Sequence, residues 1–281
     1  MRDPYLDAKG VLKNKLGFTD QNELAAFEAR IAAARDVKIL GDPPHGPFDL
    51  AKLEKLHEML FGDVYTWAGK TRIAGLAKQA HEGSAAGVTS FTAPLRIKAE
   101  ATALFRSLPS IETLSALSDA EFAASMAPFF VTLNNVHPFR EGNGRTQRLF
   151  FKLLARACGN DLAWDVVTRE RVVAASISGA RGDAAPMKRL FLEISDDRRT
   201  AALRKGLNFL RGSKSVLWND LYIATTTAGQ AYSGKLVGVA APDFMMRVEN
   251  SEQEWIAVGD ASDVPDGTAS GDALEIKPKY W

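Results

Sequence analysis

The sequence predicts a mainly α-helical domain that carries a β-hairpin and is followed by a small all-β domain. Apolar residues recur at helical spacing over most of residues 20–195. Beyond about residue 228 the pattern becomes strand-like, with Gly, Pro and Asp between the apolar runs. The 281 residues are also enough for two domains. We place the helical domain at 1–196 (core about 45–195), a connector at 197–228 and the all-β domain at 229–281.

The charge of the chain is balanced overall but uneven along its length. The formal net charge is +1, which gives no global argument for nucleic acid or an anionic membrane as partner. Residues 240–281 contain nine acidic and three basic residues, about −6, which leaves about +7 for residues 1–239. This indicates an anion-handling body with an acidic appendage, although a solvated surface has the same pattern. Because nucleic-acid backbones attract excess positive charge, we expect no nucleic-acid partner for the all-β domain.

The chain shows no sign of membrane insertion or disulfide bonding. Its N-terminus has no apolar leader, and no run approaches eighteen apolar residues. The single cysteine, Cys158, excludes an intramolecular disulfide and lies in an apolar helical stretch, so we expect a packed thiol. We therefore expect a soluble protein inside the cell, with no membrane partner.

The first two helices are predicted from their caps. Thr19 or Asp20 caps a helix that reaches about Val37, with Leu24, Phe27, Ile31 and Ala34 at helical spacing. Asp49 caps the next helix, whose apolar stripe contains Leu53, Leu56, Met59 and Leu60. His57 lies within this second helix, and a half-buried packing role is favoured over a ligand role.

Residues 70–91 change character. Ile73, Leu76, Val88 and Phe91 are spaced for two short strands, and Gly and Ser residues between them indicate a turn. We interpret the segment as a hairpin or flap. A plain connecting loop is the alternative, at even odds on these residues alone.

Later helices follow the same periodicity. Ser118 and Glu121 form a capping-box pattern, and Pro128 is expected to kink the helix that they begin. The predicted helices span residues 92–108, 118–135, 143–159, 168–179, 184–194 and 199–211. The predicted strands span residues 232–239, 244–248, 255–258 and 274–276.

One stretch concentrates groups that suit phosphate chemistry. Residues 137–149 read His-Pro-Phe-Arg-Glu-Gly-Asn-Gly-Arg-Thr-Gln-Arg-Leu, and an apolar helical run follows at once. A helix N-terminus binds phosphate through its free N–H groups and the positive end of its dipole. His137 can accept a proton near neutral pH, as a base that activates a hydroxyl group must. The stretch predicts a polyphosphate site beside a general base.

The remaining residues of this stretch fit a nucleoside triphosphate with Mg²⁺. Glu141 can hold Mg²⁺ through one carboxylate oxygen, because Mg²⁺ otherwise prefers phosphate and water. Gly142 and Gly144 let the backbone approach a phosphate, and Asn143 adds an amide donor. Two arginines three residues apart, Arg145 and Arg148, share a helix face and suit the outer phosphates.

Each of these residues also has an ordinary structural reading. A lone His before Pro-Phe is usually structural, one Gly-x-Gly is weak, and two arginines on a helix are commonly a solvated face. At fixed spacing within thirteen residues, however, the set favours function. It is not a Walker A loop, because the Lys-Ser/Thr ending is missing.

Residues 137–148 resemble the signature of Fic-domain AMP-transferases, His-x-Phe-x-Asp/Glu-Gly-Asn-Gly-Arg-x-x-Arg, at every fixed position. Residues 56–72, Leu-His-Glu-Met-Leu-Phe-Gly-Asp-Val-Tyr-Thr-Trp-Ala-Gly-Lys-Thr-Arg, also resemble that family. The match covers roughly residues 45–195. It implies a Fic-type helical bundle with a β-hairpin flap, followed by a small all-β (OB-like) domain.

The resemblance implies protein adenylyltransferase activity. A target Ser, Thr or Tyr hydroxyl would attack the α-phosphorus of ATP, leaving AMP on the target and releasing pyrophosphate. His137 would be the catalytic base, Glu141 the Mg²⁺ ligand and Phe139 a structural anchor. Nucleotide contacts would fall on Arg140, Gly142, Asn143, Gly144, Arg145 and Arg148, and target-docking contacts on the flap residues Thr71, Arg72, Ile73, Ala74, Gly75 and Leu76.

Two alternatives to AMP transfer stay open. Relatives that transfer another phosphate-containing group alter the glycine-rich loop, whereas Gly144 and Arg145 are intact here. The domain could also be a non-catalytic module that binds nucleotide or protein.

The resemblance also has implications for biology and regulation. The C-terminal module resembles the OB-like domain of Bartonella effector proteins and conjugation-associated Fic toxins, which type IV secretion exports. Those relatives carry a further delivery domain, which we do not find here. Fic proteins are typically silenced by a helix with Ser/Thr-x-x-x-Glu-Gly/Asn, and no copy occurs in these residues. We expect a toxin or effector that a small antitoxin inhibits in trans, located in the bacterial cytoplasm or, after translocation, in a recipient or host cell.

Overall fold

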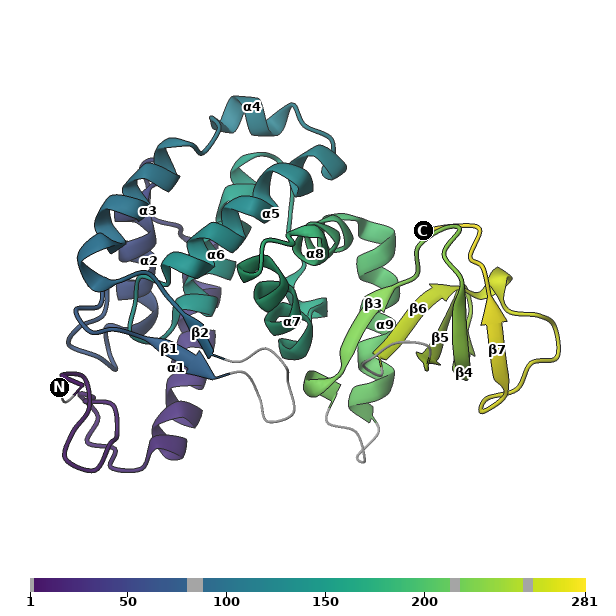
Figure 1. Ribbon diagram of the computed structural model, residues 1–281, viewed down its shortest axis with the longest axis horizontal. Coiled ribbons are helices and arrows are strands. Elements are labelled where there is room, and N and C mark those ends of the chain that lie inside the picture. The colour runs from purple at the N-terminus through teal and green to yellow at the C-terminus, as the bar shows by residue number, and fades with distance from the viewer. Residues whose placement is uncertain (1–2, 80–87, 213–217, 250–254) are drawn as a thin grey trace. The chain divides into compact units, whose positions relative to one another are not determined.

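The computed structural model describes residues 3–79, 88–212, 218–249 and 255–281 (Figure 1). The chain forms two compact units. The first contains residues 1–117 and 128–160, and the second contains residues 118–127 and 161–281. Within the described ranges, no helix is both long enough and apolar enough to cross a membrane.

The first unit begins with two capped helices, α1 (Gln21–Gly41) and α2 (Leu50–Phe61). Asp20 caps α1 by accepting hydrogen bonds from the N–H groups of Asn22 and Glu23, and Asp49 caps α2 through Lys52 N. Helix α1 continues past the predicted end at Val37.

The buried side of α1 differs from the predicted one. It consists of Leu24, Glu28, Ala32 and Ile39, whereas Phe27 is 39% exposed and Ala34 is also exposed. The difference arises because a buried carboxylate, Glu28, lies on the inner face. A pattern built from apolar residues alone therefore predicts a face that only partly coincides with the buried one, since Leu24 is buried and Ile31 half-buried.

A hairpin is present as predicted, but its first strand begins after Ile73 and Leu76, the apolar residues from which that strand was predicted. Strand β1 (Ala77–Gln79) pairs antiparallel with β2 (Val88–Ser90), in the register Ala77 opposite Ser90. Residues 80–87, where the turn was predicted, lie outside the described residues. Phe91 directly follows β2, and its N–H donates to the carbonyl of Leu76 (3.3 Å).

The rest of the first unit is helical, with a short 3₁₀ turn at Pro94–Arg96 that delays the helix predicted from residue 92. Pro94 begins that turn. The helices that follow are α3 (Ile97–Arg106), α4 (Ile111–Ser115), α5 (Asp119–Val136) and α6 (Asn143–Ala157). The short α4 was not predicted. Edge-to-face contacts among Phe129, Phe150 and Phe151 form part of the core.

The predicted capping box begins α5. The N–H of Glu121 donates to Ser118 Oγ (3.4 Å), and the N–H of Ser118 donates to Glu121 Oε2 (2.9 Å). Its first residues, to Ala127, belong to the second unit, and those from Pro128 onward belong to the first.

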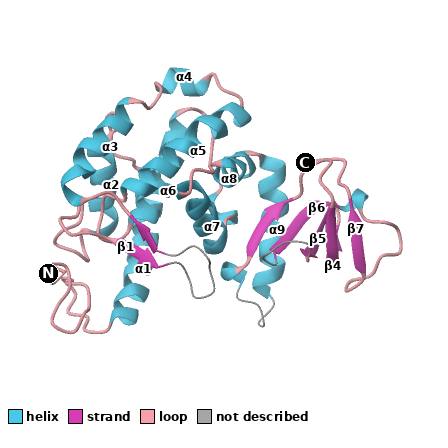
Figure 2. Cartoon of the chain, in the orientation of Figure 1, coloured by secondary structure: helices cyan, strands magenta, loops and turns pink. Residues whose placement is uncertain are grey.

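The second unit combines helices with a five-stranded sheet (Figure 2). Its helices are α7 (Arg169–Ala180), α8 (Ala185–Ser195) and α9 (Asp197–Gly212). Its strands are β3 (Tyr222–Thr225), β4 (Tyr232–Ala240), β5 (Asp243–Val248), β6 (Trp255–Asp260) and β7 (Ala273–Ile276), in the order β3-β6-β5-β4-β7. Strand β3 runs parallel to β6, and the other pairs are antiparallel.

Strand β3 lies within the predicted connector at residues 197–228 and was not predicted as a strand. A buried ion pair explains its place in the sheet. Glu193 of α8, fully buried, pairs with Arg171 of α7 (2.7 Å), and its Oε2 accepts from the N–H of Thr225 in β3 (3.1 Å). The carboxylate therefore ties two helices to the first strand.

Candidate active site

His137 lies directly after the end of α5, where its backbone adopts a left-handed conformation. Its φ is 47°, unusual for a residue other than glycine, and its N–H still donates to the carbonyl of Leu133 (3.1 Å). The side chain is 5% exposed. Its Nδ1 lies 3.1 Å from the carbonyl oxygen of Asn134. A carbonyl can only accept, so in the neutral ring the proton belongs on Nδ1 and the lone pair on Nε2.

Arg72 holds the backbone at this position. Its Nε donates to the carbonyl of His137 (2.8 Å), its Nη2 contacts those of Thr92 and Val136, and its own N–H donates to the carbonyl of Pro138 (2.8 Å). The carbonyls at a helix end lack intrahelical donors, and Arg72 supplies them. Only 1% of Arg72 is exposed, and burial lowers its pKa. Arg72, expected on the docking flap, thus binds the backbone of residues 136 and 137.

Phe91 covers one face of the base. Its ring stacks on the His137 imidazole with centroids 3.9 Å apart and planes 17° apart. Because Phe91 follows β2, the root of the hairpin limits how the imidazole can rotate. The sequence had assigned Phe91 only to a strand.

His57 of α2 fixes the loop that follows the base. It is fully buried and stacks on Phe139, with centroids 3.9 Å apart. Its Nδ1 accepts from the N–H of Gly69 (2.8 Å), so its Nε2 carries the proton and donates to the carbonyl of Glu141 (2.9 Å). Burial, the largest cause, lowers the pKa of His57 to about 4. His57 has the predicted packing role, although it is fully buried where a half-buried side chain was predicted, and it also holds the loop in place.

Asn143 closes the loop from the other side. Its Oδ1 accepts from the N–H of Phe139 (2.9 Å), and its Nδ2 donates to the carbonyl of the same residue (2.7 Å). The side chain is 3% exposed. Asn143 therefore shapes the cradle, a task that the sequence had not assigned to it.

The cradle itself is the first turn of α6. Gly142 has φ 80°, and a Cβ there would lie 2.4 Å from Cε2 of Phe61, so only glycine fits. No side chain caps the helix N-terminus. Its first N–H groups, together with the helix dipole, can thus receive an anion.

Arg148 lies at this cradle. Its Nη1 is 3.3 Å from the position that a Cβ on Gly144 would occupy, so the guanidinium folds back toward the start of α6. Burial, and then repulsion by Arg145, lowers the pKa of Arg148, while Asp36 of α1 opposes the shift. The described part of the chain places no carboxylate within ion-pair distance of Arg148.

Arg145 points to a different partner. Its Nη2 pairs with Oε1 of the buried Glu28 on α1, and its guanidinium lies over the Phe61 ring, 4.7 Å from the centroid. The same Nη2 is 3.9 Å from Glu141 Oε1. The structure therefore separates the two arginines that the sequence had treated alike.

Comparisons with known proteins identify the family of the chain. Residues 47–155 match the model of the Fic/DOC family. The chain is 38% identical over 178 residues to the "Probable protein adenylyltransferase y4lH" of Sinorhizobium fredii, covering 63% of this chain and 87% of that protein. The chain belongs to the Fic/DOC family.

Longer Fic relatives match only in part. The chain is 36% identical over 211 residues to the "Protein adenylyltransferase VbhT" of Bartonella schoenbuchensis, which covers 73% of this chain and 42% of that protein. The chain also matches a protein adenylyltransferase of Bartonella henselae, of which it covers 45%. The chain thus spans less than half the length of these two relatives.

Two solved structures superpose on the chain, one over nearly all of it and one over part of it. The type IV secretion system effector protein BepA superposes with a TM-score of 0.85 at 26% identity, over 99% of this chain and 96% of that one. BepC of Bartonella tribocorum, solved with bound AMPPNP, superposes with a TM-score of 0.61 at 32% identity, over 68% and 96%. The protein therefore has a Fic-type helical bundle with a hairpin, followed by a small five-stranded sheet that packs in one unit with α7, α8 and α9.

Arg140 of the Fic motif lies on the N-terminal segment. Its Nε and Nη2 donate to Asp3 Oδ2 at 3.1 and 2.9 Å. The pair is mostly buried, with 16% and 26% of the side chains exposed. The expected phosphate contact of Arg140 stays a prediction, and the ion pair shows what it contacts without nucleotide.

The remaining flap residues lie on the chain that leads to β1. Ile73 is 75% exposed, and its N–H donates to Tyr5 Oη (3.0 Å). Ala74 accepts from Arg72 Nη1 (2.9 Å). Thr71, Gly75 and Leu76 are partly or fully exposed. Their contact with a target stays a prediction.

Glu141 fits a Mg²⁺ ligand that acts alone. Its side chain is 36% exposed, and the searched residues contain no cluster of three His, Cys, Asp or Glu side chains that could hold a metal. Mg²⁺ bound with a nucleotide needs only one or two carboxylates, because phosphate and water complete its shell. A single accessible carboxylate at the helix that forms the cradle meets this requirement.

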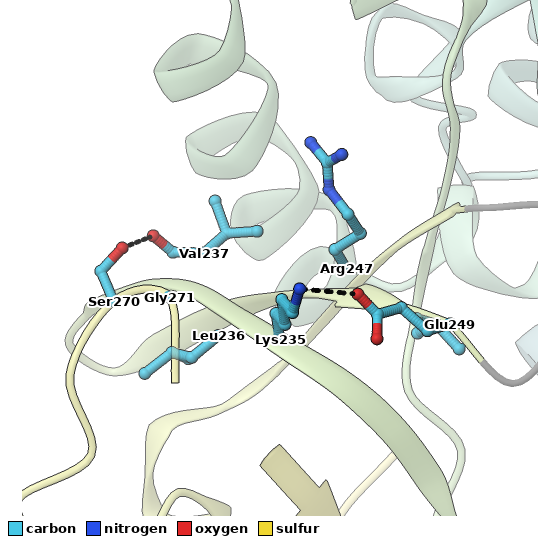
Figure 3. A pocket seen from close by; sticks show the side chains of 8 residues that line it. Lys235, Leu236, Val237, Arg247, Glu249, Ser270 and Gly271 are labelled. Carbon is cyan, nitrogen blue, oxygen red and sulfur yellow. Dashed lines mark hydrogen bonds and ion pairs between the residues drawn. The ribbon is translucent and has the colours of Figure 1, made fainter. Parts of the chain in front are cut away.

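A pocket on the sheet contains no residue of the Fic motif. Figure 3 shows its lining, which comes from β4, β5 and the segment before β7. Lys235 pairs with Glu249 (3.6 Å), and Ser270 Oγ donates to the carbonyl of Val237 (2.8 Å). Neutralisation of Lys235 by a carboxylate does not favour a phosphate ligand in this pocket.

Proposed function

We propose that the protein is a protein adenylyltransferase, which transfers AMP from ATP to a Ser, Thr or Tyr hydroxyl of a target protein. One observation carries the proposal. His137 is held with its lone pair on Nε2, immediately before the uncapped helix N-terminus on which Arg148 folds back. A base and an anion cradle thus occur within one loop. The relatives named adenylyltransferases and the AMPPNP in BepC support this choice of substrate.

The residues divide the reaction among them. His137 Nε2 takes the proton of the target hydroxyl as its oxygen bonds to the α-phosphorus. The bond from the α-phosphorus to the bridging oxygen breaks, and pyrophosphate leaves. The N–H groups of the first turn of α6 stabilise the charge on the phosphates, and Arg148 binds the outer phosphate. Mg²⁺ held by Glu141 would supply further neutralisation of the phosphates.

Labelled ATP distinguishes the candidate reactions. We expect a protein band in bacterial or host lysate after incubation with the purified chain, Mg²⁺ and α-labelled ATP, and none with γ-labelled ATP. Label from the γ-phosphate would instead indicate phosphoryl transfer. His137→Ala should abolish the band, because the hydroxyl then keeps its proton. No band at all, or a band that His137→Ala leaves unchanged, would contradict the enzyme assignment.

We also propose a biological role as a toxin or type IV secretion effector in the bacterial cytoplasm or a recipient cell. The likeness to BepA, an effector by name, supports it. An inhibitory glutamate motif is absent from the 281 residues, which favours a small antitoxin that supplies this glutamate in trans. The target is identified by a mass increase of one AMP on a lysate protein.

A further inference from the structure

We propose that Glu28 is a positioning residue of the nucleotide site. It holds Arg145 against α1, so that Arg145 orients Glu141 and leaves the outer phosphate to Arg148. This inference rests on the proposed function for the role of the site, although its test measures binding and does not require AMP transfer.

Glu28 is a buried carboxylate whose two oxygens are both engaged. It is 3% exposed, and it lies 117 residues before Arg145 in the chain. Oε1 accepts from Arg145 Nη2, and Oε2 accepts from Tyr65 Oη. A buried charge is retained only where it is paired and hydrogen-bonded, and Glu28 meets both conditions.

Tyr65 fixes the direction of the Glu28 carboxylate. Its ring is 2% exposed and stacks on Trp67, with centroids 4.2 Å apart. Burial, and then the hydrogen bond to Glu28, raises the pKa of Tyr65, so the hydroxyl stays protonated and donates at neutral pH. The carboxylate therefore has one fixed donor behind it and offers its other oxygen to α6.

Arg145 connects this pair to the cradle. The Phe61 ring lies under its guanidinium and also against the position of a Cβ on Gly142. Arg145 Nη2 is 3.9 Å from Glu141 Oε1, which is the edge of ion-pair distance. A guanidinium that Glu28 holds on one side can attract Glu141 from the other. Arg145 is thereby placed to set the orientation of the Mg²⁺ ligand.

Because Glu28 pairs with Arg145, Arg148 is the motif arginine that can bind the outer phosphate. The two guanidinium groups carry like charges on the same helix, and after burial this repulsion contributes to the lowered pKa of Arg148. Glu28 neutralises Arg145 and so reduces this repulsion. Without Glu28, Arg145 would be free to move toward the phosphates, and Glu141 would lose its fixed neighbour.

The test measures binding of AMPPNP, a non-hydrolysable nucleotide, by calorimetry over a Mg²⁺ titration. For Glu28→Gln we expect the Mg²⁺ concentration at half-maximal binding to rise about five- to tenfold, and AMP affinity to change less than about twofold. Tyr65→Phe should act in the same direction with a smaller effect. Glu23→Gln, the same change at an exposed position on α1, should behave as wild type.

A double variant separates positioning from general damage. In an Arg145→Met background, Glu28→Gln should alter the Mg²⁺ requirement by less than about twofold, because the carboxylate acts through Arg145. Equal losses for AMP and AMPPNP, an additive effect with Arg145→Met, or a Glu28→Gln variant like Glu23→Gln would each overturn the inference. If the variants give the expected binding results but the labelling experiment gives no band, the proposed AMP transfer is wrong and the role of Glu28 still stands.

Discussion

At the scale of single residues, the backbone of His137 shows how the site is built. A left-handed conformation costs energy in a residue with a Cβ, and it persists only where neighbours hold it. Arg72 and the Leu133 carbonyl do so here. Phe91 then restricts the ring, and the Asn134 carbonyl selects its tautomer. The imidazole that we propose as the base therefore has one orientation in the structure.

Arg148 gives a prediction at the same scale. Arg148→Ala should weaken ATP binding about 10- to 100-fold, because it removes charged hydrogen bonds to the outer phosphate. AMP lacks that phosphate and should lose less than about twofold. Calorimetry with both nucleotides checks this.

A matched control is available on the same helix. Arg156→Ala removes an exposed arginine near the end of α6 and should leave both affinities unchanged. If Arg148→Ala lowers the affinities for ATP and AMP equally, Arg148 does not bind the outer phosphate.

The local part of the site could be predicted, and its long-range part could not. Residues 137–148 are contiguous, so their proximity and the start of α6 follow from spacing alone, whereas their chemical roles stay predictions. Glu28 meets Arg145 across 117 residues, and Asp3 meets Arg140 across 137. Nothing in the sequence couples such positions. Glu28 was also missed because the inner face of its helix was predicted from apolar residues alone.

At the scale of elements, a buried imidazole joins α2 to the loop that precedes α6. His57 accepts from Gly69 and donates to the Glu141 carbonyl, so it must stay neutral. Protonation would place a second donor against the Gly69 N–H. The same side chain therefore couples the pH to the shape of the loop.

This coupling has a definite sign. Unfolded His57 binds a proton below about pH 6.5, whereas the folded protein protonates it only near pH 4. Between these values the unfolded state binds more protons, so stability rises with pH. The contribution is complete above pH 6.5, and about 3 kcal/mol of it is lost as the pH falls to 4.

Denaturant unfolding at several pH values tests the assignment. His57→Gln removes the titrating ring and keeps an amide that can donate. We expect lower stability at pH 7 by about 1–3 kcal/mol, from lost packing and hydrogen bonding. Its stability should also depend less on pH between 6.5 and 4 than that of the wild type. Parallel pH profiles for the two proteins would rule out His57 as the source.

At the scale of the whole molecule, the compact units do not follow the change from helices to strands. Their boundary falls within α5, and the sheet belongs with α7, α8 and α9. Glu193 shows why. Burial would raise the pKa of its carboxyl, but Arg171 and then Arg189 outweigh this and lower it. An ionised group of this kind keeps β3 with the helices. Strand β3 was missed because it lies in the stretch assigned to the connector, before the strand-like pattern begins at about residue 228.

The proposed role as a toxin gives a prediction for the whole protein. Expression of the chain alone in bacteria should arrest growth, because no inhibitory motif occurs in its sequence. His137→Ala, expressed at the same level, should restore growth. Growth curves with immunoblots of both proteins provide the measurement. If the wild-type chain and the His137→Ala variant arrest growth equally, the toxicity does not depend on His137.

Arg72 links two places that a target protein would meet at once. Its guanidinium bonds the carbonyl of Ala74, on the chain that leads into the hairpin, and the carbonyl of His137. One buried side chain therefore ties the segment on which we expect a target strand to dock to the backbone of His137. A hydroxyl would then be chosen by its position along the docked strand more than by its chemical identity. Serine, threonine and tyrosine would compete on reach, and shifting a hydroxyl by one residue would turn it away from the base.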